Sequence, residues 1–79
     1  MYIQITVDLH NYEKQGFDLR LSDQYTAKKL VDLTWKIKDM NVPRREGSWI
    51  RIANKEKVVS GDETLEGSGV TNGDRLEIL

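Results

Sequence analysis

The hydrophobic pattern of this chain changes its period once, between residues 21 and 27, and this change constrains the fold more than any other feature. Before it, apolar residues occupy every second position in two runs: Ile3, Ile5, Val7 and Leu9, then Phe17, Leu19 and Leu21. A period of two is typical of strands with one buried face. After it, apolar residues have the three-and-four spacing of an amphipathic helix: Ala27, Leu30, Leu33, Ile37 and Met40. The sequence therefore predicts a strand hairpin followed by one helix over residues 26–40.

Local signals suggest where the predicted helix starts and stops. Ser22, Asp23 and Thr26 are all candidate N-caps, so the starting residue stays open. At the other end, Asn41 can adopt the left-handed conformation of a C-cap. Pro43 favours extended geometry in the residue before it, which also ends the helix. We therefore expect the helix to finish just before Asn41.

Three further strands are expected after the helix, over residues 49–53, 58–59 and 75–79. In the first, Ile50 and Ile52 face inward while Trp49, Arg51 and Ala53 face outward. In the last, the inward residues are Leu76 and Ile78. Asn72–Gly73 predicts a turn before this strand, because both residue types tolerate positive φ.

The order strand, strand, helix, strand, short strand, strand predicts a two-layer α+β fold, because one amphipathic helix must bury its stripe against a mixed sheet. We expect the ubiquitin-like β-grasp arrangement (ββαββ), in which four to five strands pack on one helix and the first and last strands pair centrally. A small five-stranded barrel is the main alternative, but a mid-chain helix of about fifteen residues argues against it. A length of 79 residues predicts a single domain, residues 1–79.

Composition argues against several classes of function. Without cysteine the chain has no disulfide framework, zinc knuckle or thiol chemistry. Twelve Lys and Arg residues against thirteen Asp and Glu residues give a formal charge of −1, which argues against a dedicated nucleic-acid binder. The single histidine, His10, stands at the end of a predicted strand near a loop, where no catalytic triad is evident. We therefore expect no enzyme, no metal and no cofactor.

Neither a signal peptide nor a membrane span is expected. The first ten residues lack a basic region followed by an unbroken apolar stretch. No window approaches the about 20 apolar residues that a membrane helix needs. We therefore expect a cytoplasmic protein without direct membrane insertion.

Aromatic and arginine side chains are the candidate contact residues, because Trp, Tyr and Arg dominate the energetics of protein interfaces. The outward sheet face is predicted to carry Trp49, Arg51, Leu79 and Tyr2. Trp35 lies on the flank of the predicted helix. It is interpreted either as an anchor for a partner or, as we favour, as a cover for the sheet edge or the loop after the helix.

Arg44 and Arg45 are two further candidates for partner binding, in the loop that follows the predicted helix. We expect them to form a mobile positive corner that Glu46 partly offsets. The alternative is an ordinary solvated loop.

Three stretches resemble a known family: FDLRLSD (Phe17–Asp23), VPRREGSWIRIANKEKV (Val42–Val58) and GVTNGDRLEIL (Gly69–Leu79). Through them the whole chain resembles the YukD/EsaB family, small ubiquitin-like proteins of the type VII secretion system of Gram-positive bacteria. The resemblance implies a β-grasp fold, no enzymatic activity and a cytosolic accessory or regulatory role in the export of small helical substrates. Related ubiquitin-like modules are fused to membrane components in the actinobacterial systems. The implied partners are therefore proteins of the secretion membrane complex, including its ATPase.

We expect docking without covalent conjugation, at a location peripheral to the secretion complex. Conjugation of ubiquitin requires a flexible tail ending in Gly-Gly, whereas Leu79 falls inside the last predicted strand. A protein modifier or sulfur carrier is the disfavoured alternative. A third possibility is a nucleic-acid-linked regulator, which Glu46 and Glu56 argue against, and its contacts would be Arg44, Arg45, Arg51, Lys55 and Lys57.

Overall fold

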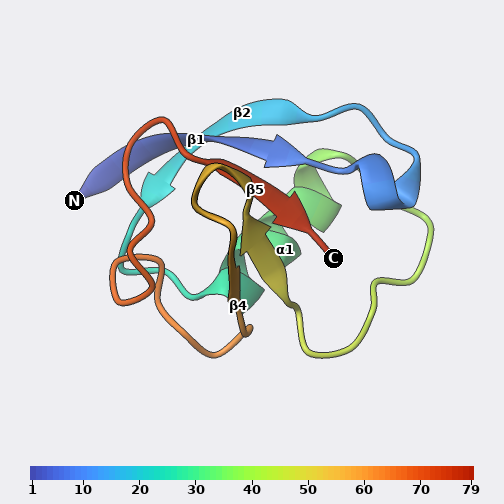
Figure 1. Ribbon diagram of the computed structural model, residues 1–79. Coiled ribbons are helices and arrows are strands. Elements are labelled where there is room, and N and C mark those ends of the chain that lie inside the picture. The colour runs from blue at the N-terminus through green and yellow to red at the C-terminus, as the bar shows by residue number, and fades with distance from the viewer.

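The computed structural model describes all 79 residues and places one α-helix behind a five-stranded sheet (Figure 1). The strands are β1 (Tyr2–Asp8), β2 (Phe17–Ser22), β3 (Ile50–Ile52), β4 (Lys57–Val59) and β5 (Arg75–Ile78). The helix is α1 (Ala27–Ile37), and two 3-10 turns are η1 (His10–Tyr12) and η2 (Ala53–Lys55). The predicted α+β class is confirmed.

The sheet has the strand order β2-β1-β5-β3-β4. β1 and β5 are parallel, while the pairs β1–β2, β3–β5 and β3–β4 are antiparallel. The first and last strands therefore pair next to the centre of the sheet, as the β-grasp arrangement requires, and that expectation is confirmed. β2 and β4 are the two edges.

The core lies between the inner sheet face and α1 and contains 15 buried apolar residues. The alternating residues of β1 are buried as predicted. On α1 the buried face is rotated from the predicted stripe: Val31 and Thr34 are fully covered, whereas Ile37 is 53% exposed. Thr34 is tolerated in the core because its hydroxyl donates to the Leu30 carbonyl at 2.9 Å.

The helix begins where one candidate cap predicts and ends earlier than expected. The Thr26 hydroxyl accepts the Lys29 N–H at 3.1 Å, so Thr26 is the N-cap. The predicted left-handed C-cap at Asn41 is wrong, because Asp39 takes that conformation with φ 48. The Met40 N–H then donates to the Trp35 carbonyl at 3.0 Å, which closes the end of α1 in a Schellman motif.

The third and last strands are shorter than predicted. The chain leaves the extended conformation at Ala53, where η2 begins, and Glu56 with φ 51 returns it to β4. The 3-10 geometry between β3 and β4 was not predicted from the sequence. The turn at Asn72–Gly73 is confirmed, with Gly73 at φ +89.

No helix of the structure combines the length and the apolar character that crossing a bilayer requires.

Candidate functional site

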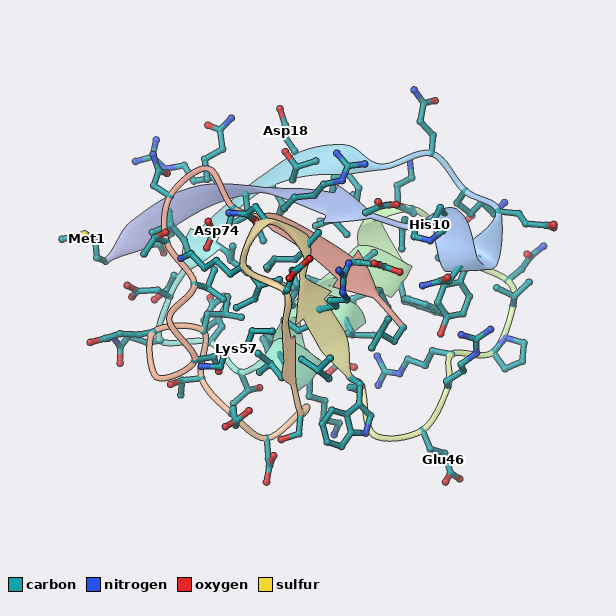
Figure 2. All side chains as sticks on the ribbon, in the orientation of Figure 1. Met1, His10, Asp18, Glu46, Lys57 and Asp74 are labelled. Carbon is teal, nitrogen blue, oxygen red and sulfur yellow. The ribbon has the colours of Figure 1, made fainter.

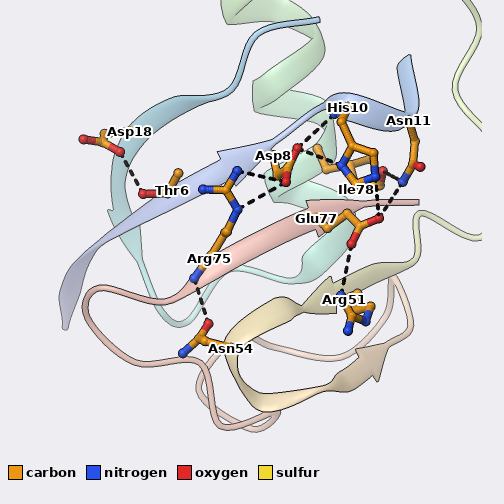
Figure 3. A network of polar contacts seen from close by, with 10 residues as sticks. All are labelled: Thr6, Asp8, His10, Asn11, Asp18, Arg51, Asn54, Arg75, Glu77 and Ile78. Atoms are coloured by element: carbon orange, nitrogen blue, oxygen red, sulfur yellow. Dashed lines mark hydrogen bonds and ion pairs between the residues drawn. The ribbon is translucent and has the colours of Figure 1, made fainter. Parts of the chain in front are cut away.

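The sheet face that points away from α1 carries a chain of polar contacts across three strands (Figure 3). Asp8 Oδ2 accepts from Arg75 Nη2 at 3.0 Å, and Asp8 Oδ1 lies 3.0 Å from His10 Nδ1. His10 Nε2 lies 3.3 Å from Glu77 Oε2, and Arg51 Nη1 donates to Glu77 Oε1 at 3.3 Å. Arg51 faces outward as predicted, but it is a member of this network and not a free cation.

The contacts of two carboxylates lower their pKa: Asp8 in this network and Asp74 beside η2. Partial burial raises the pKa of Asp8, but hydrogen bonds from His10 and Arg75 outweigh it, so the pKa lies below its ordinary value. The same balance holds at Asp74. Burial raises its pKa, but hydrogen bonds from Lys55, Asn54 and Thr71 lower it by more, so the pKa again lies below its ordinary value. Both carboxylates therefore serve the architecture of the fold.

Trp49 keeps 46% of its surface exposed, and its backbone and ring each have a neighbour in the fold. Its carbonyl accepts the Leu79 N–H at 3.1 Å. Its ring lies against Gly47, whose φ is +88, and a Cβ at Gly47 would approach the ring Nε1 to 2.5 Å. The positive φ and the nearby ring both favour glycine at this position. An exposed tryptophan ring is a candidate interface anchor.

The position of Trp49 differs in part from the prediction. β3 starts one position later, at Ile50, so Trp49 stands at the end of the sheet. It borders a shallow hollow whose other residues come from three segments, Lys28, Gly47, Ser48, Ser60, Gly61 and Asp62. Because Lys28 belongs to α1, Trp49 lies at the margin of the outer face and not at its centre.

Four residues form a continuous region that we call the Trp49 surface: Trp49, Arg51, Val58 and Leu79. The backbone bond from Leu79 joins the first and last of them, and Arg51 pairs with Val58 across β3 and β4. Val58 is 51% exposed and was not singled out from the sequence. The signal for it was present, because an outward valine opposite Arg51 follows from the alternation of β4.

At the predicted mobile positive corner, both the Arg44 and the Arg45 side chain have partners within the fold. Arg44 forms an ion pair with Asp32 of α1. The Arg45 guanidinium lies 5.5 Å from the centre of the Tyr12 ring, and the Arg45 N–H donates to the Tyr12 hydroxyl at 3.1 Å. These contacts attach the loop to the fold. Glu46 projects from the same loop into solvent (Figure 2).

Trp35 covers the loop after the helix, as favoured from the sequence. Its Nε1 donates to the Val42 carbonyl at 2.9 Å, and its ring packs edge-on against Tyr12 with centroids 4.9 Å apart. The Tyr12 hydroxyl also donates to the Leu79 carbonyl at 2.8 Å. Sequence reasoning missed Tyr12, which lies between the two strands of the predicted hairpin.

Tyr2 lies apart from the Trp49 surface. It is 63% exposed at the start of β1, opposite Ser22 of β2, and it borders a hollow with Arg20 and Asn72. β5 and β3 separate this end of β1 from β4. The structure therefore divides the predicted contact residues between two regions and assigns Trp35, Arg44 and Arg45 contacts within the fold.

The basic side chains of the nucleic-acid alternative also have partners. Lys55 Nζ lies 2.9 Å from Asp74 Oδ2, and Lys57 Nζ donates to the Ser68 carbonyl at 2.9 Å. With Arg44, Arg45 and Arg51 engaged as described, these residues do not form an unpaired basic patch.

Comparison with known proteins gives the family. Residues 2–78 match the family described as "WXG100 protein secretion system (Wss), protein YukD". The chain is 54% identical over 79 residues to the ESX secretion system protein YukD of Bacillus subtilis (strain 168), and the match covers all of both chains.

Solved structures support the fold. The ubiquitin of Caldiarchaeum subterraneum superposes with a TM-score of 0.74 at 17% identity, covering 99% of this chain and 91% of that one. The C-terminal ubiquitin-like domain of mouse tubulin-specific chaperone e gives 0.67 at 18% identity, with 99% and 84% covered. These likenesses confirm the ubiquitin-like fold.

Proposed function

This chain belongs to the YukD family of the WXG100, or type VII, protein secretion system, and we propose that it is a non-catalytic accessory protein that docks on proteins of the secretion membrane complex. Its partners would include the ATPase of that complex, approached from the cytoplasmic side. Membership of the family supports a role in secretion, and the Trp49 surface supports docking as the way in which that role is carried out.

The observation that carries the proposal is the exposure of the Trp49 ring beside Gly47, at the end of the sheet. Tryptophan is among the residues that contribute most to the energetics of protein interfaces. The exposed ring, together with Val58, offers apolar area to a partner. Arg51, held by Glu77, supplies a polar rim beside that area.

The docking is proposed to be non-covalent. The Leu79 N–H donates to Trp49 and its carbonyl accepts from Tyr12, so both backbone groups are engaged within the fold. A covalent linkage made through Leu79 would have to break these contacts. Incubation with ATP and cell lysate, followed by mass spectrometry, tests this point, and a reproducible adduct through Leu79 would contradict it.

The substitution Trp49→Ala tests the surface. We expect it to weaken capture of the secretion membrane complex by about 2 kcal/mol of binding free energy, as for an interface anchor. Thermal unfolding of the variant should stay close to the wild type, because the ring is half exposed. Tyr2→Ala is the matched control, an exposed aromatic residue at the other end of the sheet. Unchanged capture with Trp49→Ala, or an equal loss with Tyr2→Ala, would show that the partner uses another surface.

A further inference from the structure

β2 is an open edge of the sheet. Its only neighbouring strand is β1, and in Figure 1 it runs along the upper margin of the molecule with no strand beyond it. It is six residues long, whereas the opposite edge strand β4 has three. An edge of this length presents a row of backbone groups that another strand can pair with.

The register of β1 and β2 shows which backbone groups are free. The Asp23 N–H donates to the Met1 carbonyl at 2.9 Å, and Ile3 pairs with Leu21 and Ile5 with Leu19. Because hydrogen-bonded pairs alternate in an antiparallel ladder, the odd-numbered residues of β2 bond to β1. The N–H and C=O groups of Asp18 and Arg20 therefore point to the open side.

The same two residues carry opposite charges. Both side chains are exposed, and neither forms an ion pair within the chain. Asp18 accepts the Thr6 hydroxyl at 2.9 Å with one oxygen, Oδ1, and it projects from the upper margin of the molecule in Figure 2. Being two positions apart in a strand, the two side chains lie on the same sheet face.

β2 is complementary to a second copy of itself. Antiparallel pairing through the free backbone groups allows registers centred on Asp18, Leu19 or Arg20. Centring on Asp18 or Arg20 would place two like charges opposite each other. Centring on Leu19 places Asp18 of each copy opposite Arg20 of the other, and it pairs Phe17 with Leu21. Phe17 and Leu19 are half-buried in the single chain, so the second copy would cover their exposed parts.

We propose that this chain forms a two-fold symmetric dimer in which β2 pairs with β2 of a second copy, centred on Leu19. The two sheets then join into one continuous sheet. Charged residues on an edge strand ordinarily prevent such pairing. Here their opposite signs favour one register, because opposite charges across strands attract and like charges repel. A two-fold axis repeats each contact, so the pair Asp18–Arg20 occurs twice.

Charge substitutions test the dimer by sedimentation equilibrium. Asp18→Arg makes the edge wholly positive and Arg20→Asp makes it wholly negative, and each should raise the dimer dissociation constant at least about tenfold. The double variant with both substitutions restores the opposite charges and should dimerise like the wild type. A mixture of the two single variants should form a heterodimer that neither forms alone. Circular dichroism of each variant verifies that the monomer is folded.

Two results would overturn the proposal. One is a wild-type chain that stays monomeric up to about 1 mM, a concentration at which even a weak specific pair is populated. The other is a dimer that both single variants form as readily as the wild type. Trp49→Ala should leave dimerisation unchanged, so the test is independent of the proposed docking surface.

Discussion

The two edges of the sheet are protected in different ways. At β4 the edge is short, and the segment between β4 and β5 is bound to it, since Lys57 Nζ donates to the Ser68 carbonyl. At β2 the edge is long, open and occupied on its outer face by two charges of opposite sign. The comparison indicates that the loop after β4 is attached to the fold, whereas β2 is left available for an association.

The segment that follows β4 is irregular but well attached to the start of α1. A single bridge joins Thr26 to Thr64, and the Leu65 N–H donates to the Tyr25 carbonyl at 2.9 Å. The Ala27 N–H donates to Glu63, which also links the segment to the start of α1. Leu65 itself is fully buried in the core. This loop is therefore part of the folded core in energetic terms.

The largest expected effect follows from Leu65. Leu65→Ala should lower the free energy of unfolding by about 2–5 kcal/mol, because it leaves a cavity under a fully buried side chain. Leu19→Ala at the β2 edge is the matched control and should lower it less, because Leu19 keeps part of its surface in water. Urea denaturation measures both. An equal or greater loss at Leu19 would show that the β2 edge contributes as much to stability as the loop does.

A smaller effect is expected at Asp74, beside η2. Its carboxylate is buried and accepts from Asn54 Nδ2 and the Thr71 N–H, both at 2.8 Å. Asp74→Asn should lower the free energy of unfolding at pH 7 by about 1–3 kcal/mol. The amide nitrogen of asparagine cannot accept a hydrogen bond, so one of the buried donors around residue 74 would lose its acceptor. Asp18→Asn, at the exposed β2 edge, should change it by less than about 0.5 kcal/mol.

Acid unfolding sharpens the result at Asp74. Burial raises its pKa and the bonds from Lys55, Asn54 and Thr71 lower it more, so the folded-state pKa is below 3.8. The stabilisation by Asp74 is complete above the ordinary, unfolded-state pKa of 3.8, and it is lost as the pH falls through the folded-state pKa. The wild type should therefore lose stability at pH below 3.8, and Asp74→Asn should lose less. The variant should still lose some stability in acid, because the pKa of Asp8 is lowered too. An unchanged pH profile would exclude this role of Asp74.

The strands and the core were predictable because their signal is local. Alternation along the chain identified the buried residues of β1, and the turn at Gly73 followed from its backbone freedom. The buried face of α1 was predicted only in part. Its rotation toward Thr34 depends on a hydroxyl that bonds to the turn before it, which hydrophobic spacing does not register.

The candidate site was less predictable because its contacts join distant parts of the chain. The grouping of Trp49, Arg51 and Leu79 followed from alternation, and the structure brings them together. The partner of Arg45 is Tyr12, which lies 33 positions away. No spacing rule connects two residues across such a separation, so the loop was interpreted as mobile. Aromatic contacts between residues distant in the chain are therefore the part of this fold that could not be predicted from the sequence.

The smallest expected change in the free energy of unfolding is found by substituting one cation at each edge, Lys57 in β4 and Arg20 in β2. Lys57→Ala removes the bond to Ser68 and should lower the free energy of unfolding by about 0.5–1.5 kcal/mol. Arg20→Ala should leave it within about 0.5 kcal/mol in dilute solution, because Arg20 has no partner within the chain. At high protein concentration the thermal stabilities of the two variants should differ by more than they do in dilute solution.

The dependence of stability on protein concentration distinguishes the roles of the two edges, because dimerisation stabilises the folded chain by mass action. The wild type and Lys57→Ala should therefore both gain thermal stability as the concentration rises, by the same amount. Arg20→Ala, which removes both cross-strand ion pairs of the dimer, should gain much less. Differential scanning calorimetry over a wide concentration range measures this. If all three proteins show the same concentration dependence, the β2 edge has no role in association and the contrast between the two edges concerns stability alone.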